Sequence, residues 1–355
     1  MNEIPPADPS PSVAIVGCGA IGGVLGAELA RARHSFSICT TNADVRSVWA
    51  TTGPYLAERL VSYPLAAHRI LTDPSEAQHP LDLVFVAVPP AQMDSVASSL
   101  KSVLSPRGRV VCLSNGWCEP RLAHVLGEDR VLGAVVTWGA KMPQPGHYVR
   151  TSEGGFVLGS LSGTWPASTE RIIHLLSTVG PVSRTNNLKG ARMSKLVINC
   201  AVSGLGTVGG AELGELLVKS HIRHIGIQLM AEAITVARAD GTTLQNVAGI
   251  DWERWTIGRR RLGVRLYQHA LLMAVGLRYR HLRSSILASI ERGRPPAIDY
   301  INGEVSALGQ RLGIATPYND AVVDTVWKIA RGEIVPGHLA LRHVAELGEA
   351  RSPSL

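Results

Sequence analysis

The chain of 355 residues lacks an uninterrupted apolar run of about 18 residues, the length that a membrane-spanning helix needs. Residues 1–11 also lack a basic stretch followed by an apolar one, so we expect a flexible lead-in there and no signal peptide. A hydrophobic content of 45% and a charged content of 18% are typical of soluble globular proteins. These features predict a cytoplasmic protein with no membrane partner.

Cysteine is scarce, and its spacing matches neither a disulfide framework nor a metal site. We therefore expect reduced thiols without a chemical role, in a reducing compartment, and no bound metal. The cysteines are Cys18, Cys39, Cys112, Cys118 and Cys200.

A nucleic-acid-binding motif is also missing, although the formal net charge is +7. The basic residues are scattered apart from Arg259, Arg260 and Arg261, which we interpret as a solvated helix face. The sequence thus predicts no nucleic-acid partner. A mild positive field would still favour an anionic cofactor or substrate.

The first half of the chain alternates short apolar runs with segments of helical length, a pattern typical of parallel strands buried on both faces. It predicts a doubly wound α/β domain with the runs Val13–Val16, Phe36–Thr40, Leu81–Val88, Val110–Leu113 and Val131–Val136 as its strands. Further strands are expected at His147–Val149, Phe156–Leu158 and Val182–Ser183.

The second half has helical periodicity, with Glu212–Ala239 as its longest stretch, and predicts an all-helical domain. Asp299 is interpreted as the N-cap of a helix that ends at Gly313, and Pro317 as the start of another. The predicted parts are a lead-in, a dinucleotide-binding domain, a helical domain and a tail, over residues 1–11, 12–187, 188–335 and 336–355.

The segment VAIVGCGAIGGVLGAELA places Gly17, Gly19 and Gly22 in GxGxxG spacing between a strand and a helix. Such glycines permit a tight turn and a close approach of the backbone to a pyrophosphate, which the helix N-terminus also favours. This context indicates a dinucleotide site more strongly than a structural glycine turn. The residues expected to contact the cofactor are Gly17, Cys18, Gly19, Ala20, Ile21 and Gly22.

The end of the second predicted strand lacks the carboxylate that binds the ribose hydroxyls of NAD. The residues there are Thr40, Thr41 and Asn42, and Arg46 follows a turn later. Without a carboxylate a 2′-phosphate is not repelled, so we expect NADP with Thr41 and Arg46 near its phosphate. NAD stays open, because Asp44 lies close enough in sequence to serve a ribose.

The segment RMSKLVINCAVSG places Arg192, Lys195, Asn199 and Ser203 among apolar residues. On a helix the four polar positions fall within a stripe roughly 80° wide. The stripe follows the predicted domain boundary, so we expect it at a ligand site between the domains. Taken alone, the pattern also fits a surface lysine and a hydrogen bond between helices.

Three further stretches, LSNGWCEPRL, SKLVINCAVSG and SSILASIERGRPPAIDYINGEVSALGQRLGIATPYN, follow the glycine loop in an order that resembles the ketopantoate reductases (2-dehydropantoate 2-reductases) over residues 12–332. The resemblance implies a Rossmann domain followed by a helical domain like that of 6-phosphogluconate dehydrogenase. It also implies NADPH-dependent reduction of a 2-oxo acid to a 2-hydroxy acid, and a homodimer.

Individual site residues follow from the same resemblance. Lys195 matches the family's catalytic lysine, which donates a proton to the carbonyl oxygen as hydride arrives. Asn199 and Ser285 match substrate-binding residues, and Asn115 matches an asparagine near both nicotinamide and substrate. An ammonium group suits this chemistry, because hydride transfer to a ketone builds negative charge on oxygen.

Three positions depart from the family pattern. Ala297 stands in place of a glutamate that contacts the substrate, Pro89 in place of a lysine near the cofactor, and Ser203 in place of an asparagine. We still expect Ser203 to contact the substrate. The departures leave open a close analogue of ketopantoate, an imine or another carbonyl as substrate, or a dinucleotide-binding protein without catalysis.

The segment from 249 to 283 is longer and more aromatic than the family pattern. We expect it to reshape the cleft or an oligomer contact. Trp252 and Trp255 within it are interpreted as core residues and not as a ligand platform.

Overall fold

The structure, a computed structural model, describes residues 12–57, 59–246, 252 and 262–351. The chain divides into two compact units, residues 1–188 and 189–355, one residue from the predicted boundary. The expected lead-in, the basic triplet and one of the two tryptophans lie outside the described residues, at 1–11, 259–261 and 255.

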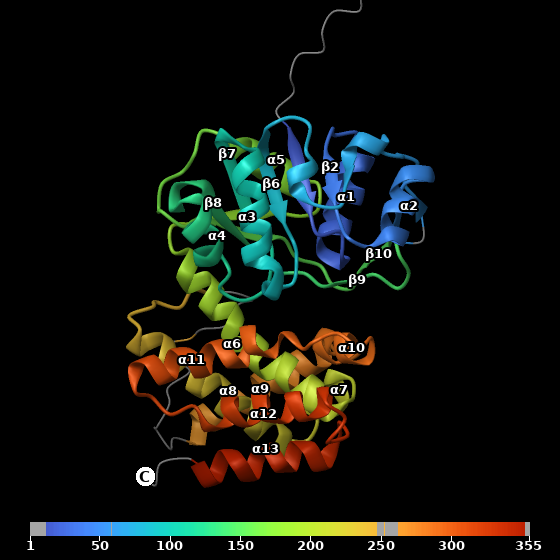
Figure 1. The fold of residues 1–355 in the computed structure, drawn as a ribbon. Helices are drawn as coiled ribbons and strands as arrows, with labels where there is room; N and C mark the ends of the chain where they lie inside the picture. Colours follow the sequence, from blue (N-terminus) through green and yellow to red (C-terminus); the bar gives the residue numbers. More distant parts are fainter. Residues whose placement is uncertain (1–11, 58, 247–251, 253–261, 352–355) are drawn as a thin grey trace, which may run out of the picture. The chain divides into compact units, whose positions relative to one another are not determined.

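The first unit is built on an eight-stranded sheet, which confirms the predicted doubly wound α/β fold (Figure 1). Neighbouring strands pair in parallel except β8 and β11, which are antiparallel. Across the sheet the strands are β12 (Val182–Thr185), β11 (Phe156–Ser160), β8 (Val131–Val136), β7 (Leu104–Cys112), β6 (Leu81–Val86), β1 (Val13–Val16), β2 (Ser37–Cys39) and β5 (Ile70–Leu71).

Strands β1 and β8 are apolar and buried throughout because both faces of the sheet are covered. Successive side chains alternate between two cores: Ile15 and Phe85 belong to one, whereas Ala14 and Val84 belong to the other. The first core is completed by α1 (Ala20–Arg31), α2 (Ala43–Thr51) and α5 (Thr169–Ser177), and the second by α3 (Met93–Val103) and α4 (Glu119–Leu126).

A second, four-stranded sheet was not expected from the sequence. The predicted strand at His147–Val149 does form, but it pairs in this small sheet and not in the large one. Its partners are only two residues long, too short to leave an alternating pattern. In order the strands are β4 (Arg59–Leu60), β3 (Tyr55–Leu56), β10 (His147–Arg150) and β9 (Ala140–Lys141).

The second unit is helical in the part that the structure describes, as predicted, and its helices share one apolar core. Trp252 is 5% exposed and lies in that core, as expected. The helices are α6 (Leu188–Gly209), α7 (Leu213–Leu217), α8 (Ser220–Ala239), α9 (Leu262–Arg278), α10 (Ser285–Glu291), α11 (Asn302–Leu312), α12 (Pro317–Ala330) and α13 (His338–Arg351).

The stretch Glu212–Ala239, which the sequence predicted as the longest helical one, is divided into α7 and α8. Helix α6, with 22 residues, is longer than either of them. Lys219 is extended, with ψ near 123°, and separates α7 from α8. Hydrogen bonds to residues far along the chain keep α7 separate from α8. Leu213 N donates to Leu282 O at 3.0 Å, and Gly214 N donates to Arg280 O at 3.1 Å.

Two predictions near the C-terminus are wrong. Asp299 is not an N-cap: it lies in a 3-10 turn, and its carboxylate instead accepts a hydrogen bond from Trp327 Nε1 at 2.9 Å. The expected tail contains α13, which buries Leu341 and Val344 in the helical core. Gly313 does end α11, in the left-handed conformation, and Pro317 does begin α12.

Candidate active site

The glycine loop after β1 has the geometry that a pyrophosphate site requires. Gly17 has φ of +94°, and a Cβ there would lie 2.7 Å from the Ala87 carbonyl oxygen. A Cβ at Gly22 would overlap the Gly17 carbonyl oxygen, so the helix and the loop pack closely. A Cβ at Gly19, the N-cap of α1, would meet no atom within 4 Å. The loop is therefore closed on its inner side and open at Gly19, where a phosphate can reach the helix N-terminus.

The loop lies at the point where the strand order reverses. From β1 the chain proceeds to β2 on one side of the sheet and later returns to β6 on the other side. Ligands of doubly wound sheets bind outside the carboxyl ends of the strands at such a point. The sheet thus favours the predicted cofactor position.

The segments after β6 and β7 extend this edge of the sheet. Ser114 Oγ donates to the Val88 carbonyl oxygen at 2.7 Å and joins the two segments. Asn115, the next residue, is exposed, and its carbonyl oxygen accepts a bond from Cys118 Sγ at 3.3 Å. Pro89 is exposed at the equivalent place after β6. These two loops can border a nicotinamide, although Pro89 offers it no N–H.

The end of β2 carries hydroxyls and a guanidinium, as the sequence indicated. Thr41 is exposed, and the half-buried Arg46 on α2 donates from Nη1 to the Thr40 carbonyl oxygen at 2.8 Å. Asn42 caps α2 by accepting a bond from Val45 N at 3.1 Å. The arginine is therefore fixed beside the strand end, which is the place where the sequence leads us to expect the 2′-phosphate.

The polar stripe of the second unit lies on α6. Lys195, Asn199 and Ser203 are half-buried and share that side of the helix with Ile198 and Val202. The intervening apolar residues on its other sides are buried in the helical core, among them Leu196, Val197, Cys200 and Ala201. Arg192, the fourth residue of the stripe, is 3% exposed and thus belongs to the interior.

Two residues that the sequence analysis missed attach α10 to α6. Thr207 Oγ1 donates to the Ser203 carbonyl oxygen at 2.7 Å, and Ser284 Oγ lies 2.7 Å from the same hydroxyl. Ser284, not Ser285, caps α10 and is 8% exposed, whereas Ser285 is exposed. The structure thereby brings Ser285 next to the part of α6 that carries Ser203. The pattern of two serines before an apolar pair is an N-cap signal that points to this arrangement.

A buried polar network, which the sequence did not predict, connects α6 with three neighbouring helices. Asn302 Nδ2 donates to the Cys200 carbonyl oxygen at 3.2 Å and to Asn319 Oδ1 at 2.9 Å. Asn319 Nδ2 donates in turn to Leu229 O and to Glu232 Oε2, at 3.2 and 2.7 Å. Both asparagines are fully buried. Their bonds join α6, α8, α11 and α12 and fix the register of the helix that carries Lys195.

The cysteine thiols of the described residues are buried. All five are free and buried, and burial raises the pKa of the thiols of Cys18 and Cys200 and that of Cys39 to about 12. Thiols of this kind are poor nucleophiles and poor metal ligands. No group of three metal-ligating side chains occurs within the described ranges. Among these residues there is likewise no helix long and apolar enough to cross a membrane.

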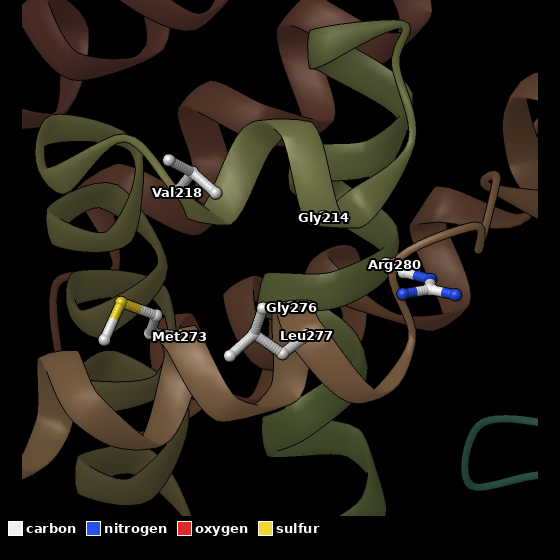
Figure 2. A pocket seen from close by; sticks show the side chains of 6 residues that line it. All are labelled: Gly214, Val218, Met273, Gly276, Leu277 and Arg280. Carbon is white, nitrogen blue, oxygen red and sulfur yellow. The ribbon is translucent and has the colours of Figure 1, made fainter.

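A small apolar hollow between α7 and α9 contains none of the predicted site residues (Figure 2). Figure 2 shows the side chains of Met273 and Leu277 on α9 and that of Val218 just after α7. The hollow is lined by Gly214, Val218, Met273, Gly276, Leu277 and Arg280.

Similar solved structures show the same architecture. A PanE/ApbA family ketopantoate reductase from Ralstonia eutropha is 26% identical, covers 91% of this chain and 99% of its own, and has a TM-score of 0.75. A D-mandelate dehydrogenase in a ternary structure with NADH and anilino(oxo)acetate has 20% identity, coverage of 91% and 100% and a TM-score of 0.76. A dimeric ketopantoate reductase from Staphylococcus aureus has 18% identity, coverage of 91% and 100% and a TM-score of 0.66. The last two likenesses concern the fold alone.

Sequence comparison identifies the family. Residues 13–163 match the family described as ketopantoate reductase PanE/ApbA, and residues 187–330 match its C-terminal domain. A 2-dehydropantoate 2-reductase from Archaeoglobus fulgidus is 26% identical over 253 residues, which are 71% of this chain and 77% of the relative. With its glycine loop and its lysine-bearing helix in the family's order, this chain is an oxidoreductase of the ketopantoate reductase family.

Proposed function

We propose that the protein reduces the carbonyl group of a 2-oxo acid, ketopantoate or a close analogue, with NADPH. The observation that carries the proposal is the half-buried lysine of α6, aligned on one helix side with Asn199 and Ser203 in a chain that also has an open glycine loop. The likeness to 2-dehydropantoate 2-reductases supports this reaction.

The cofactor residues would act through backbone amides and one cation. The loop from Gly17 to Gly22 would hold the pyrophosphate, and Thr41 with Arg46 would bind the 2′-phosphate. Asn115 would orient the nicotinamide from the segment after β7. When bound, the dinucleotide supplies the hydride.

The residues of the second unit would bind and protonate the substrate. Lys195 Nζ would donate the proton that the carbonyl oxygen gains as hydride reaches the adjacent carbon, which yields the 2-hydroxy acid. Asn199 and Ser203 would hydrogen-bond the substrate from successive turns of the same helix. Ser285 would bind its carboxylate, held near α6 by the bond between Ser284 and Thr207.

A second candidate substrate class is favoured by the residues that replace the family's polar groups. Ala297 is half-buried and carries no carboxylate, and the exposed Pro89 has no ammonium group. Each replacement removes a contact and leaves the proton donor in place. An imine or a carbonyl compound without the hydroxyl group of ketopantoate would not need these contacts. The ternary D-mandelate dehydrogenase structure contains anilino(oxo)acetate, which supports an oxo acid other than ketopantoate as the substrate.

The decisive experiment is a cofactor-oxidation screen. Purified protein is mixed with NADPH or NADH and with ketopantoate, a set of other 2-oxo acids or a cyclic imine, and the loss of nicotinamide absorbance is followed. We expect turnover with at least one 2-oxo acid and faster turnover with NADPH. Turnover with the imine alone would replace the proposed substrate class, and no turnover with any carbonyl compound would overturn it.

We also propose a homodimer formed through α9. Leu266, Met273 and Leu277 are 62%, 45% and 67% exposed, and their spacing of seven and four residues places them on one side of that helix. A second copy can bury this stripe and fill the apolar hollow of Figure 2. The dimeric relative from Staphylococcus aureus supports the assembly. Light scattering should give a dimer for the parent and a monomer for Leu277→Glu; a monomeric parent would contradict the proposal.

The free, buried cysteines support a cytoplasmic protein, because thiols persist in reducing compartments.

A further inference from the structure

Tyr148 on β10 connects the glycine loop to α2. Its hydroxyl donates to the Cys18 carbonyl oxygen at 3.2 Å and accepts a bond from Trp49 Nε1, also at 3.2 Å. Tyr148 and Trp49 are 0% exposed and Cys18 is 2% exposed. A phenol can donate one hydrogen bond and accept others, so one buried hydroxyl satisfies both partners. Burial also raises the pKa of the Tyr148 phenol, which keeps the proton that it donates.

Gly23 accommodates the tyrosine ring. The dinucleotide fingerprint accounts for Gly17, Gly19 and Gly22 but does not require a glycine directly after them. A Cβ at Gly23 would overlap the ring of Tyr148. Gly23, the fourth glycine of the loop segment, therefore leaves the space in which the tyrosine ring packs against the first turn of α1.

The bond to Cys18 determines how the loop faces solvent. A trans peptide directs its C=O and its N–H in opposite directions, and the described residues contain no cis peptide. The Cys18 carbonyl is held toward the buried tyrosine, so the N–H of Gly19 in the same peptide unit is turned the other way. A Cβ at Gly19 would also meet no atom within 4 Å, so the residue that carries this N–H leaves room for a ligand.

We propose that Tyr148 is a positioning residue of the dinucleotide site, whose hydroxyl fixes the Cys18–Gly19 peptide so that the loop presents its N–H to the pyrophosphate. The inference rests on the proposed use of a nicotinamide dinucleotide. Through Trp49 the same hydroxyl also contacts α2, which carries Arg46. This second bond anchors the phenol, and the proposed role in cofactor binding is assigned to the bond with Cys18 alone.

The first test is Tyr148→Phe, which removes the hydroxyl and keeps the ring. Loss of a buried hydrogen bond predicts that NADPH binds about three- to tenfold more weakly, measured as Kd by calorimetry. The KM for NADPH should rise by a similar factor, while kcat at saturating NADPH stays within about twofold of the parent. Amide hydrogen exchange in residues 17–23 should quicken in the cofactor-free variant, a readout that needs no activity.

Trp49→Phe is the matched control. It removes the other hydrogen bond of the same hydroxyl and leaves the bond to Cys18, so it should lower Tm while the Kd for NADPH stays within about twofold. If both variants lower Tm and neither changes the Kd, Tyr148 has a structural role only and the proposal is wrong. If the parent itself binds neither NADPH nor NADH, the proposed function and this inference both fail.

Gly23→Ala provides a second variant should Tyr148→Phe not fold. Its methyl group would displace the tyrosine ring and draw the hydroxyl away from Cys18 without removing it. We expect weaker NADPH binding of the same order as for Tyr148→Phe. Unchanged affinity in folded Gly23→Ala would overturn the proposal.

Discussion

Glu232 on α8 binds the N-terminus of α12 through Asn319, whose backbone N and side-chain Nδ2 both donate to Oε2, at 2.9 and 2.7 Å. The N–H of Tyr318 donates to the other carboxylate oxygen at 2.9 Å. Helix N-termini favour a negative charge, yet burial dominates here and raises the pKa of Glu232 from its ordinary value of 4.5 to about 7. The carboxylate that secures α12 is therefore an ionisable group poised near neutral pH.

Stability should consequently depend on the ionisation of Glu232. Between its ordinary pKa of 4.5 and its folded pKa of about 7, the folded state binds a proton that the unfolded state lacks. The stabilisation is complete below the lower value and is lost as the pH rises through the higher one. At about 1.4 kcal/mol per pKa unit, the difference is on the order of 3 kcal/mol.

Glu232→Gln should remove this pH dependence from the free energy of unfolding. Urea titrations from about pH 5 to about pH 8 would show a shallower fall for the variant than for the parent, whatever its absolute stability. Glu346→Gln is the control, because Glu346 is exposed and forms an ion pair with Arg342, one turn earlier on the same helix. Parallel curves for the parent and Glu232→Gln would contradict the assignment.

Lys195→Ala should lower kcat by about 10²- to 10⁴-fold, the usual contribution of a general acid. The Kd for NADPH should stay within about twofold, because the lysine is assigned to the carbonyl oxygen. Lys195→Arg should also be slow, since a guanidinium keeps its charge and does not release a proton near neutral pH. Single-turnover rates at saturating cofactor provide the measurement.

Lys189→Ala is the control for that experiment. Lys189 lies on the same helix but forms an ion pair with Asp240 at 2.6 Å. Its loss should leave kcat within about twofold. A Lys195→Ala enzyme that turns over as fast as Lys189→Ala would show that the proton comes from another group.

The sequence predicted those parts of the fold whose local pattern is strong. Val13–Val16 and Val131–Val136 form strands over the predicted residues, because runs buried on both faces admit no polar residue. The end of α11 at Gly313 was likewise predictable from the glycine alone, because glycine adopts the left-handed conformation that ends many helices. The small sheet was not, since its pairing depends on contacts between residues far apart in the chain.

In the candidate site, too, the features with a local sequence pattern were predictable and those that depend on distant contacts were not. The stripe of Lys195, Asn199 and Ser203 follows from helical periodicity alone, and the structure places it on one helix side. Thr207 and Asn302, which hold the surrounding helices, carry no local signal, because their partners lie 77 and 102 positions away in the sequence. Such supporting contacts become visible only in three dimensions.

Arg46→Ala should separate the two dinucleotides. Because a charged hydrogen bond to phosphate is worth about 1.5 to 3 kcal/mol, the KM for NADPH should rise roughly tenfold or more while that for NADH changes by less than about twofold. Arg31→Ala is the control, since Arg31 pairs with Glu28 at the far end of α1. An equal loss for both cofactors would mean that Arg46 supports the fold of the strand end, through its bond to Thr40, and does not read the 2′-phosphate.

Ala297→Glu should shift substrate preference toward ketopantoate. Ala297 begins the 3-10 turn that precedes α11 and is half-buried there, and the resemblance to the family implies a substrate-binding glutamate at this position. A carboxylate at this position can accept a hydrogen bond from the hydroxyl group of ketopantoate, which a simple 2-oxo acid lacks. The ratio of kcat/KM for ketopantoate to that for 2-oxobutanoate should therefore rise roughly tenfold. Ala297→Gln, of similar size and without charge, should give a smaller rise, because its amide is a weaker acceptor. If Ala297→Glu lowers kcat/KM for both substrates alike, the side chain at 297 does not face the substrate, and the preference of this enzyme is determined by other residues.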